Sequence, residues 1–164
     1  MKRSILIVLC FAVSFLANAQ SNSKLYTYKQ FGNKYVVSIQ NHAEITKAIT
    51  AFVEEHNIKA GTISGLGAVS EATLRFFDPA TKEFVDKTFT EQMEITNLTG
   101  NISQQNDNHY IHMHVTLGRN DYTALAGHLL TAKINGAGEF VIESFDGTVN
   151  RYYDENIGLN LYNF

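Results

Sequence analysis

The stretch YIHMHVTL, residues 110–117, alternates polar and apolar side chains and so predicts a β-strand. Successive side chains of a strand point to opposite faces, so His112 and His114 would project from one face, about 7 Å apart along the strand. The opposite face would carry the apolar side chains of Ile111, Met113 and Val115. This segment therefore places two imidazoles side by side over one surface of a sheet.

A third imidazole follows in the segment AGHL, residues 126–129. A turn at residues 118–121 would return the chain as a neighbouring strand and bring His128 beside the pair. Three neutral imidazoles around one point are the ligand set of an open zinc site, although imidazole also suits iron and nickel. We expect His112, His114 and His128 to bind zinc or another divalent transition metal. The residues alone leave two alternatives open, a solvated His-x-His pair and a hydrogen-bonded core histidine at position 128.

The flanking sequence predicts more strands and one helix. Residues 25–40 alternate around a turn at residues 31–34, which is typical of a β-hairpin. Residues 43–56 carry an apolar stripe at helical spacing, with Asn41 as the expected cap, Glu44 completing a capping box, and His56 near the helix-end carbonyl groups. Further strands are expected over residues 59–63, 69–77, 83–89, 93–102, 109–117, 128–134 and 139–145.

Turn signals separate these segments. Gly65-Leu66-Gly67 lacks the third glycine and the helix of a phosphate-binding loop, so a tight turn or bulge between strands is the better interpretation. We expect a polar loop at residues 103–108 and a Gly-rich turn at residues 135–138, whereas the tail from Arg151 has no clear period. One helix and mostly antiparallel strands predict an α+β domain, with a barrel-like sheet of about seven or eight strands and the helix packed on it.

The N-terminus predicts export. Lys2 and Arg3 precede an apolar run over residues 5–16, and Ala17-Asn18-Ala19 forms a cleavage site, which together are the parts of a secretory signal peptide. The alternative is an N-terminal anchor, but this run is shorter than the about 20 residues of a membrane span. We expect residues 1–19 to be removed and residues 20–164 to form a single domain in the periplasm or outside the cell, without a membrane segment.

Removal of this segment would also remove the single cysteine, Cys10, and two of the 13 basic residues, leaving 11 against 16 acidic ones. The formal net charge of −3 then becomes −5, and no run of Lys or Arg is present. Such a chain repels phosphate backbones, so this charge argues against nucleic acid as a partner. The mature chain would have no disulfide and no thiolate ligand.

Four motifs resemble the plants-and-prokaryotes conserved (PPC) domain family. They are GLGAVS at residues 65–70, MEITNLTGNI at 93–102, HMHVTL at 112–117 and GHL at 127–129, and the likeness covers about residues 25–145. The resemblance implies an antiparallel α+β subunit that assembles as a homotrimer, in a family whose bacterial members are often described as predicted DNA-binding proteins. The AT-hook core Arg-Gly-Arg-Pro of plant members is absent here.

The fold of this family is similar to that of acetolactate decarboxylase, a zinc enzyme that holds its metal by a His-x-His pair and a later histidine. The resemblance implies that His112, His114 and His128 are the corresponding ligands. Glu94 lies in an expected strand between Met93 and Ile95, where a desolvated carboxyl group could serve in acid/base catalysis or be a structural hydrogen-bond acceptor.

Two further residues are candidates for substrate contacts. Tyr110 is expected on the same face as His112, where it orients a substrate or fills the barrel. Arg75 is expected either to pair with a substrate carboxylate or to be solvated. Three functions follow: a metal-binding protein that is a metalloenzyme acting on a small carboxylate or keto acid, a non-catalytic binding module, or a DNA-binding protein.

Overall fold

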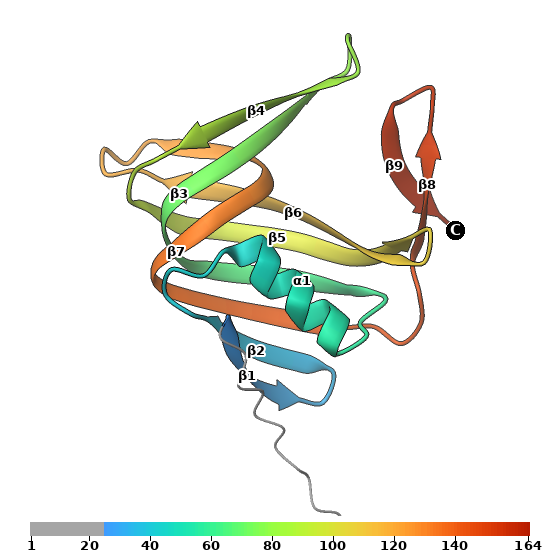
Figure 1. The fold of residues 1–164 in the computed structure, drawn as a ribbon, viewed down its shortest axis with the longest axis horizontal. Coiled ribbons are helices and arrows are strands. Elements are labelled where there is room, and N and C mark those ends of the chain that lie inside the picture. Colours follow the sequence, from blue (N-terminus) through green and yellow to red (C-terminus); the bar gives the residue numbers. More distant parts are fainter. Residues whose placement is uncertain (1–24) are drawn as a thin grey trace, which may run out of the picture.

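The computed structural model describes residues 25–164, which form one helix and a nine-stranded sheet (Figure 1). The predicted signal peptide, residues 1–19, lies outside the described residues. The elements are β1 (Tyr26–Phe31), β2 (Lys34–Ile39), α1 (Ile45–Glu55), β3 (Gly61–Asp78), β4 (Glu83–Phe89), β5 (Met93–Gln105), β6 (Asn108–Gly118), β7 (Ala124–Ser144), β8 (Asn150–Asp154) and β9 (Leu159–Asn163). The predicted α+β class and largely antiparallel sheet are confirmed.

The sheet is partly ring-like and is not a true barrel. The strands β3, β5, β6 and β7 pair in a closed cycle, in which β3 contacts β5 and β7, and β6 also contacts both. The cycle closes because β7 is 21 residues long and pairs with different neighbours along its length, β6 near its start and β2 near its end. The remaining strands extend the sheet outside this ring, β1 beyond β2, β4 beside β3, and β8 with β9 beside β5.

The predicted N-terminal hairpin is confirmed as β1 and β2. Its two strands pair from Tyr26 opposite Ile39 to Phe31 opposite Lys34, and Gly32 in the turn has a φ of 61°. The side chains of β2 alternate between exposed and buried positions along the whole strand. Sequence alternation at period two therefore produces the local structure that it predicts.

The apolar stripe of α1 is confirmed, because Ile45, Ala48, Ile49, Phe52 and Val53 are all buried. The helix packs against β7 and β6. Its C-terminus is also as expected, since the backbone carbonyl of Phe52 lies 2.9 Å from Nδ1 of His56. Among residues 25–164, no helix is long and apolar enough to cross a membrane.

The prediction of Asn41 as the helix cap is wrong. Glu44 is the N-cap residue, and its carboxylate accepts hydrogen bonds from the backbone N–H groups of Thr46 and Lys47. The carboxylate also accepts the N–H of Ala132 on β7, so the cap is attached to the sheet. The side chain of Asn41 instead accepts the N–H of Gly136.

The Gly-x-Gly segment lies inside β3 and forms a bulge there. The register between β3 and β5 shifts between Gly65 and Gly67, which confirms the bulge, although the strand continues through it. A Cβ atom on Gly65 would lie 2.3 Å from the ring of Phe140, and Gly67 has a φ of 153°. Both glycines are therefore needed for packing and backbone conformation.

The structure corrects three other boundaries. The expected loop at residues 103–108 is a tight turn, in which Asn106 and Asp107 have positive φ values of 50° and 62°. The expected turn at residues 135–138 is absent, because β7 runs through it with Gly136 at a φ of 123°. The tail that showed no period forms a β8–β9 hairpin, which joins β5 through the parallel pair Gln104 and Asn150 (Figure 1).

Candidate metal centre

The structure brings the three predicted histidines together. His112 and His114 lie on β6, and His114 is directly opposite His128 on β7. One ligand atom from each ring lies within 4.8 Å of those of the other two, and the ring centroids are 5.0 to 5.5 Å apart. The alternation along β6 and the β6–β7 register are the two features that create this cluster.

The surroundings keep two of these imidazoles neutral. Burial, followed by the neighbouring imidazoles of His128 and His114, lowers the pKa of His112 to about 4. Burial and the charges of His114 and Arg75 lower the pKa of His128, while Asp86 acts in the opposite direction. Both imidazoles are therefore in the neutral form that binds metal ions near neutral pH.

Two of the three imidazoles have the spacing of ligands to one metal ion. The Nε2 atoms of His112 and His114 are 3.1 Å apart. Two imidazoles bound to one tetrahedral zinc at about 2.0–2.1 Å would place their nitrogens at a similar separation. Two imidazole nitrogens this close need a proton or a cation between them, and a third nitrogen lies within 4.8 Å of both.

The cluster opens into a pocket of about 720 Å³, a size typical of small-molecule sites. The β3–β4 hairpin forms one wall and the β8–β9 hairpin forms another. Near the hairpin tips, Nζ of Lys82 donates to the carbonyl of Glu155 at 3.0 Å. The walls are largely apolar and aromatic, and include Phe76, Phe77, Phe84, Tyr110, Leu161 and Tyr162.

Comparison with known families supports the four sequence motifs. The model of the Plants and Prokaryotes Conserved (PCC) domain, the family indicated by those motifs, matches residues 26–146. This chain belongs to the PCC domain family. A comparison with curated proteins finds no match.

Two solved structures are similar to this chain at 30% identity or more. A protein from Bacteroides thetaiotaomicron, described as a candidate DNA-binding protein, is 58% identical, with a TM-score of 0.84 over 85% of this chain and 98% of that one. A metal-containing protein from Archaeoglobus fulgidus is 30% identical, with a TM-score of 0.75 over 87% of this chain and 100% of that one. A Staphylococcus aureus protein described as similar to alpha-acetolactate decarboxylase is only 10% identical with a TM-score of 0.48, too distant to support an argument.

Arg75 of this PCC domain is neither solvated alone nor free for a ligand. Its guanidinium donates to both carboxylate oxygens of Asp86, at 2.7 and 2.8 Å, and lies 4.8 Å from the ring centroid of Phe84. Arg75 pairs in register with His128. This ion pair is therefore part of the surroundings of the third imidazole, and the hydrogen bond from Arg75 lowers the pKa of Asp86.

Arg151 is a pocket residue that sequence reasoning missed, and it lies beyond the part of the chain matched by the PCC model. It comes from β8 and reaches across to β5, where it contacts Ser103 and Asn101. The sequence shows only an isolated arginine among aromatic residues at this position. Its partners on β5 lie about 50 positions earlier in the chain, so the local pattern does not predict these contacts.

The structure does not bring Glu94 to the histidines. Glu94 is exposed near the start of β5, where it pairs with Ala68 and Gly118. His112 pairs with Asn101, seven residues further along β5, which is roughly 20 Å away along a strand. The carboxyl group of Glu94 is not desolvated as expected, because side chains alternate along β5. Its neighbours Met93 and Ile95 face the core, and Glu94 faces solvent. Tyr110 does lie on the His112 side, in the pocket wall.

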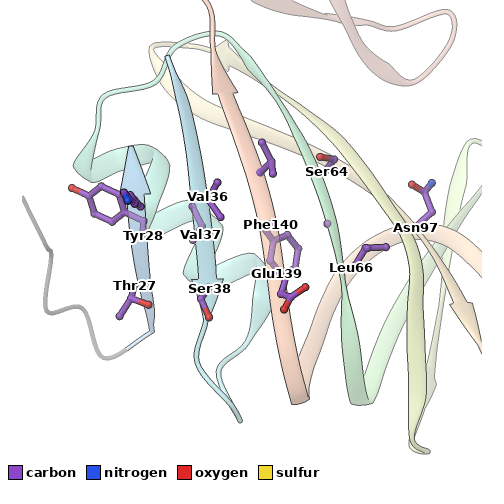
Figure 2. Close-up of a pocket in the computed structure, with 13 residues that line it drawn as sticks. Thr27, Tyr28, Val36, Val37, Ser38, Ser64, Leu66, Asn97, Glu139 and Phe140 are labelled. Atoms are coloured by element: carbon purple, nitrogen blue, oxygen red, sulfur yellow. The ribbon is translucent and has the colours of Figure 1, made fainter. Parts of the chain in front are cut away.

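A second pocket of about 740 Å³ lies on the face of the sheet formed by β1, β2, β7, β3 and β5. Figure 2 shows Val36, Leu66 and Phe140 among its labelled side chains. Val36 and Leu66 are about half exposed, whereas Phe140 is buried over Gly65. Within residues 25–164, the metal-ligand cluster belongs to the first pocket and not to this one.

Proposed function

We propose that this PCC-domain protein binds a divalent transition metal, zinc in the first instance, through His112, His114 and His128, and acts on a small carboxylate or keto acid. The observation that carries the proposal is the convergence of three imidazole nitrogens within 4.8 Å of one another at a pocket of about 720 Å³. The 30% identical relative from Archaeoglobus fulgidus, which is described as metal-containing, supports the metal.

The ligand count favours an open site. Structural zinc sites have four protein ligands, whereas catalytic sites have three and leave a position for water or substrate. The cluster found among the described residues has three. This count favours a metalloenzyme over a non-catalytic binding module with a structural metal.

The chain's own residues prepare this site. When bound, such an ion polarises a substrate carbonyl group and lowers the pKa of a bound water. Burial keeps His112 neutral and available as a ligand, and the aromatic side chains of the walls offer apolar surface to a substrate. Arg75 on β3 lies opposite His128 on the neighbouring strand β7, and Arg75 forms an ion pair with Asp86 there.

Metal analysis tests the proposal directly. The purified protein, His112→Ala and His128→Ala would be loaded with Zn²⁺, desalted and assayed for metal by mass spectrometry. We expect the wild type to retain metal and both variants to lose most of it. His42→Ala is the matched control, because His42 is exposed and outside the cluster. Equal metal content in all four proteins would contradict the proposal.

DNA binding is the second candidate function, because the 58% identical relative is described as a candidate DNA-binding protein. The net charge of −3 and the absence of basic runs in the sequence weigh against it. DNA retention that weakens steeply with salt would support this function. No retention at low salt would remove it.

We also propose export and self-association as a homotrimer. Export is supported by the signal-like residues 1–19, and sequencing of the mature N-terminus tests it, with cleavage after Ala19 as the expected result.

The trimer is supported by the family resemblance. The half-exposed side chains Val36 and Leu66 on the outer face of the sheet are consistent with it. Light scattering coupled to size-exclusion chromatography would measure the mass.

A further inference from the structure

Arg151 is held in a fixed orientation at the wall of the histidine pocket. Its Nε donates to Oγ of Ser103 at 2.7 Å, and its two terminal nitrogens donate to Oδ1 of Asn101 and to the carbonyl of Asn160, each at 2.8 Å. Ser103 is fully buried, so the anchoring oxygen is itself fixed. Because Asn101 pairs with His112 across β5 and β6, Arg151 lies beside the three-histidine cluster.

Two aromatic rings support the guanidinium. Its carbon lies 4.6 Å from the ring centroid of Tyr110 and 4.3 Å from that of Tyr162. Such cation–π contacts stabilise a cation that is partly removed from water. A guanidinium has five N–H donors, and the three hydrogen bonds of Arg151 leave two of them for a ligand.

The charge of Arg151 has no carboxylate partner within residues 25–164. The ion pairs in this part of the chain involve Lys34, Arg75 and Arg119, and the Arg151 hydrogen bonds all go to neutral oxygens. Among the residues that the structure describes, no Asp or Glu lines the pocket. Arg75, the other pocket arginine, is neutralised by Asp86. The pocket therefore contains one oriented positive charge that lacks a counterion.

The rest of the pocket is suited to an apolar group. Phe76, Phe77 and Phe84 form the wall on the β3–β4 side, and Leu159 and Leu161 form the wall on the β9 side. The volume of about 720 Å³ exceeds what a two- or three-carbon acid fills. An oriented cation in an apolar pocket matches an organic anion with a large apolar body.

We propose that this pocket binds an organic carboxylate with an aromatic-sized apolar body, and that Arg151 binds the carboxylate group. The inference deepens the proposed function, on which it rests for the role of the neighbouring metal site. A guanidinium hydrogen-bonds a carboxylate in a fixed geometry, so Arg151 would orient the ligand as well as attract it. Arg151 is therefore a specificity-determining residue.

The competing explanation is purely structural. Arg151 joins β8 to β5 and β9, so it could serve only to attach the C-terminal hairpin. In that case, substitution would lower the melting temperature and leave ligand affinity unchanged in the folded protein. Affinity and stability must therefore be measured together.

The experiment uses phenylacetate as the probe, with acetate and 2-phenylethanol as comparison ligands. Calorimetric titrations would be run on metal-free and Co²⁺-loaded protein for the wild type, Arg151→Met and Arg151→Lys. Arg119→Met is the matched control, because Arg119 pairs with Glu91 outside the pocket. We expect Arg151→Met to weaken phenylacetate binding about tenfold or more, and Arg119→Met to leave it unchanged. Acetate, without the ring, and 2-phenylethanol, without the charge, should bind the wild type more weakly than phenylacetate.

Equal phenylacetate affinity in the wild type and folded Arg151→Met would overturn the inference, and so would equal binding of acetate and phenylacetate. If the wild type does not bind Co²⁺, only the proposed metal site is refuted. Phenylacetate binding to the metal-free protein that depends on Arg151 would still support the inference. If Arg151→Met does not fold, the Nε–H NMR signal of Arg151 in the wild type decides. It should shift with phenylacetate and not with 2-phenylethanol, and no shift would overturn the inference.

Discussion

His112 shows how single residues prepare the centre. It lies between two other imidazoles and close to Arg151, and all of these neighbours disfavour its protonation. Burial acts in the same direction and is the largest cause. A side chain that cannot easily bind a proton is left available for a metal ion, and this property comes from residues on β6, β7 and β8.

The lowered pKa predicts a pH dependence of stability in the metal-free protein. An unfolded chain takes up a proton at His112 near pH 6.5, whereas the folded protein does so at about pH 4. Between these values the unfolded state binds more protons, so the free energy of unfolding should fall as the pH decreases from 6.5 to 4 and level off below. The lowered pKa of His128 acts in the same direction.

Urea unfolding across this pH range would measure the effect, and side-chain ¹H–¹⁵N NMR would follow the imidazole itself. His112→Gln should show a shallower pH dependence than the wild type. An imidazole of His112 that titrates near pH 6.5 in the folded protein would contradict the prediction.

Among the elements, β3 shows why a glycine can be required within a strand. The ring of Phe140 on β7 lies over Gly65 and occupies the space that a Cβ atom would need. Gly65→Ala should therefore destabilise the protein by about 1–3 kcal/mol through overpacking. Gly127→Ala is the control, because its nearest contact would be an ordinary 3.4 Å, and it should change stability by about 1 kcal/mol or less. Denaturant unfolding of both variants measures the difference, and equal costs would contradict this explanation.

The elements that could be predicted from the sequence are those specified by local pattern. Alternation specified β1, β2 and β6, and the helical stripe specified α1. Gly136 and Gly138 looked like a turn because a bulge in a long strand and a turn between two strands both use glycine.

Within the site, the His-x-His spacing predicted one face of β6. Arg151 could not be predicted, because its orientation depends on Ser103 and Asn101, which are distant in the sequence.

In the whole molecule, a closed four-strand ring carries the histidines, and a separate hairpin completes their pocket. The ring strands pair with neighbours on both sides, whereas β8 joins the main sheet through the single pair of Gln104 and Asn150. Few pairs mean a lower local opening free energy. We expect the amides of β8 and β9 to exchange with solvent deuterium faster than those of β3 and β7.

Hydrogen exchange followed by mass spectrometry would compare these segments in one sample. Phenylacetate should slow exchange in β8 if Arg151 binds it, and 2-phenylethanol should have a smaller effect. Equal protection of the hairpin and the ring without ligand would contradict the assignment of the hairpin as a less stable wall.

Anomalous diffraction from a crystal of the metal-loaded protein, recorded at the absorption edge of the ion, would show directly whether the three imidazoles hold the metal. We expect a peak within about 2.0–2.1 Å of one nitrogen each from His112, His114 and His128, together with a ligand that does not come from the protein. A peak at another site, or a fourth protein ligand that closes the coordination sphere, would contradict it.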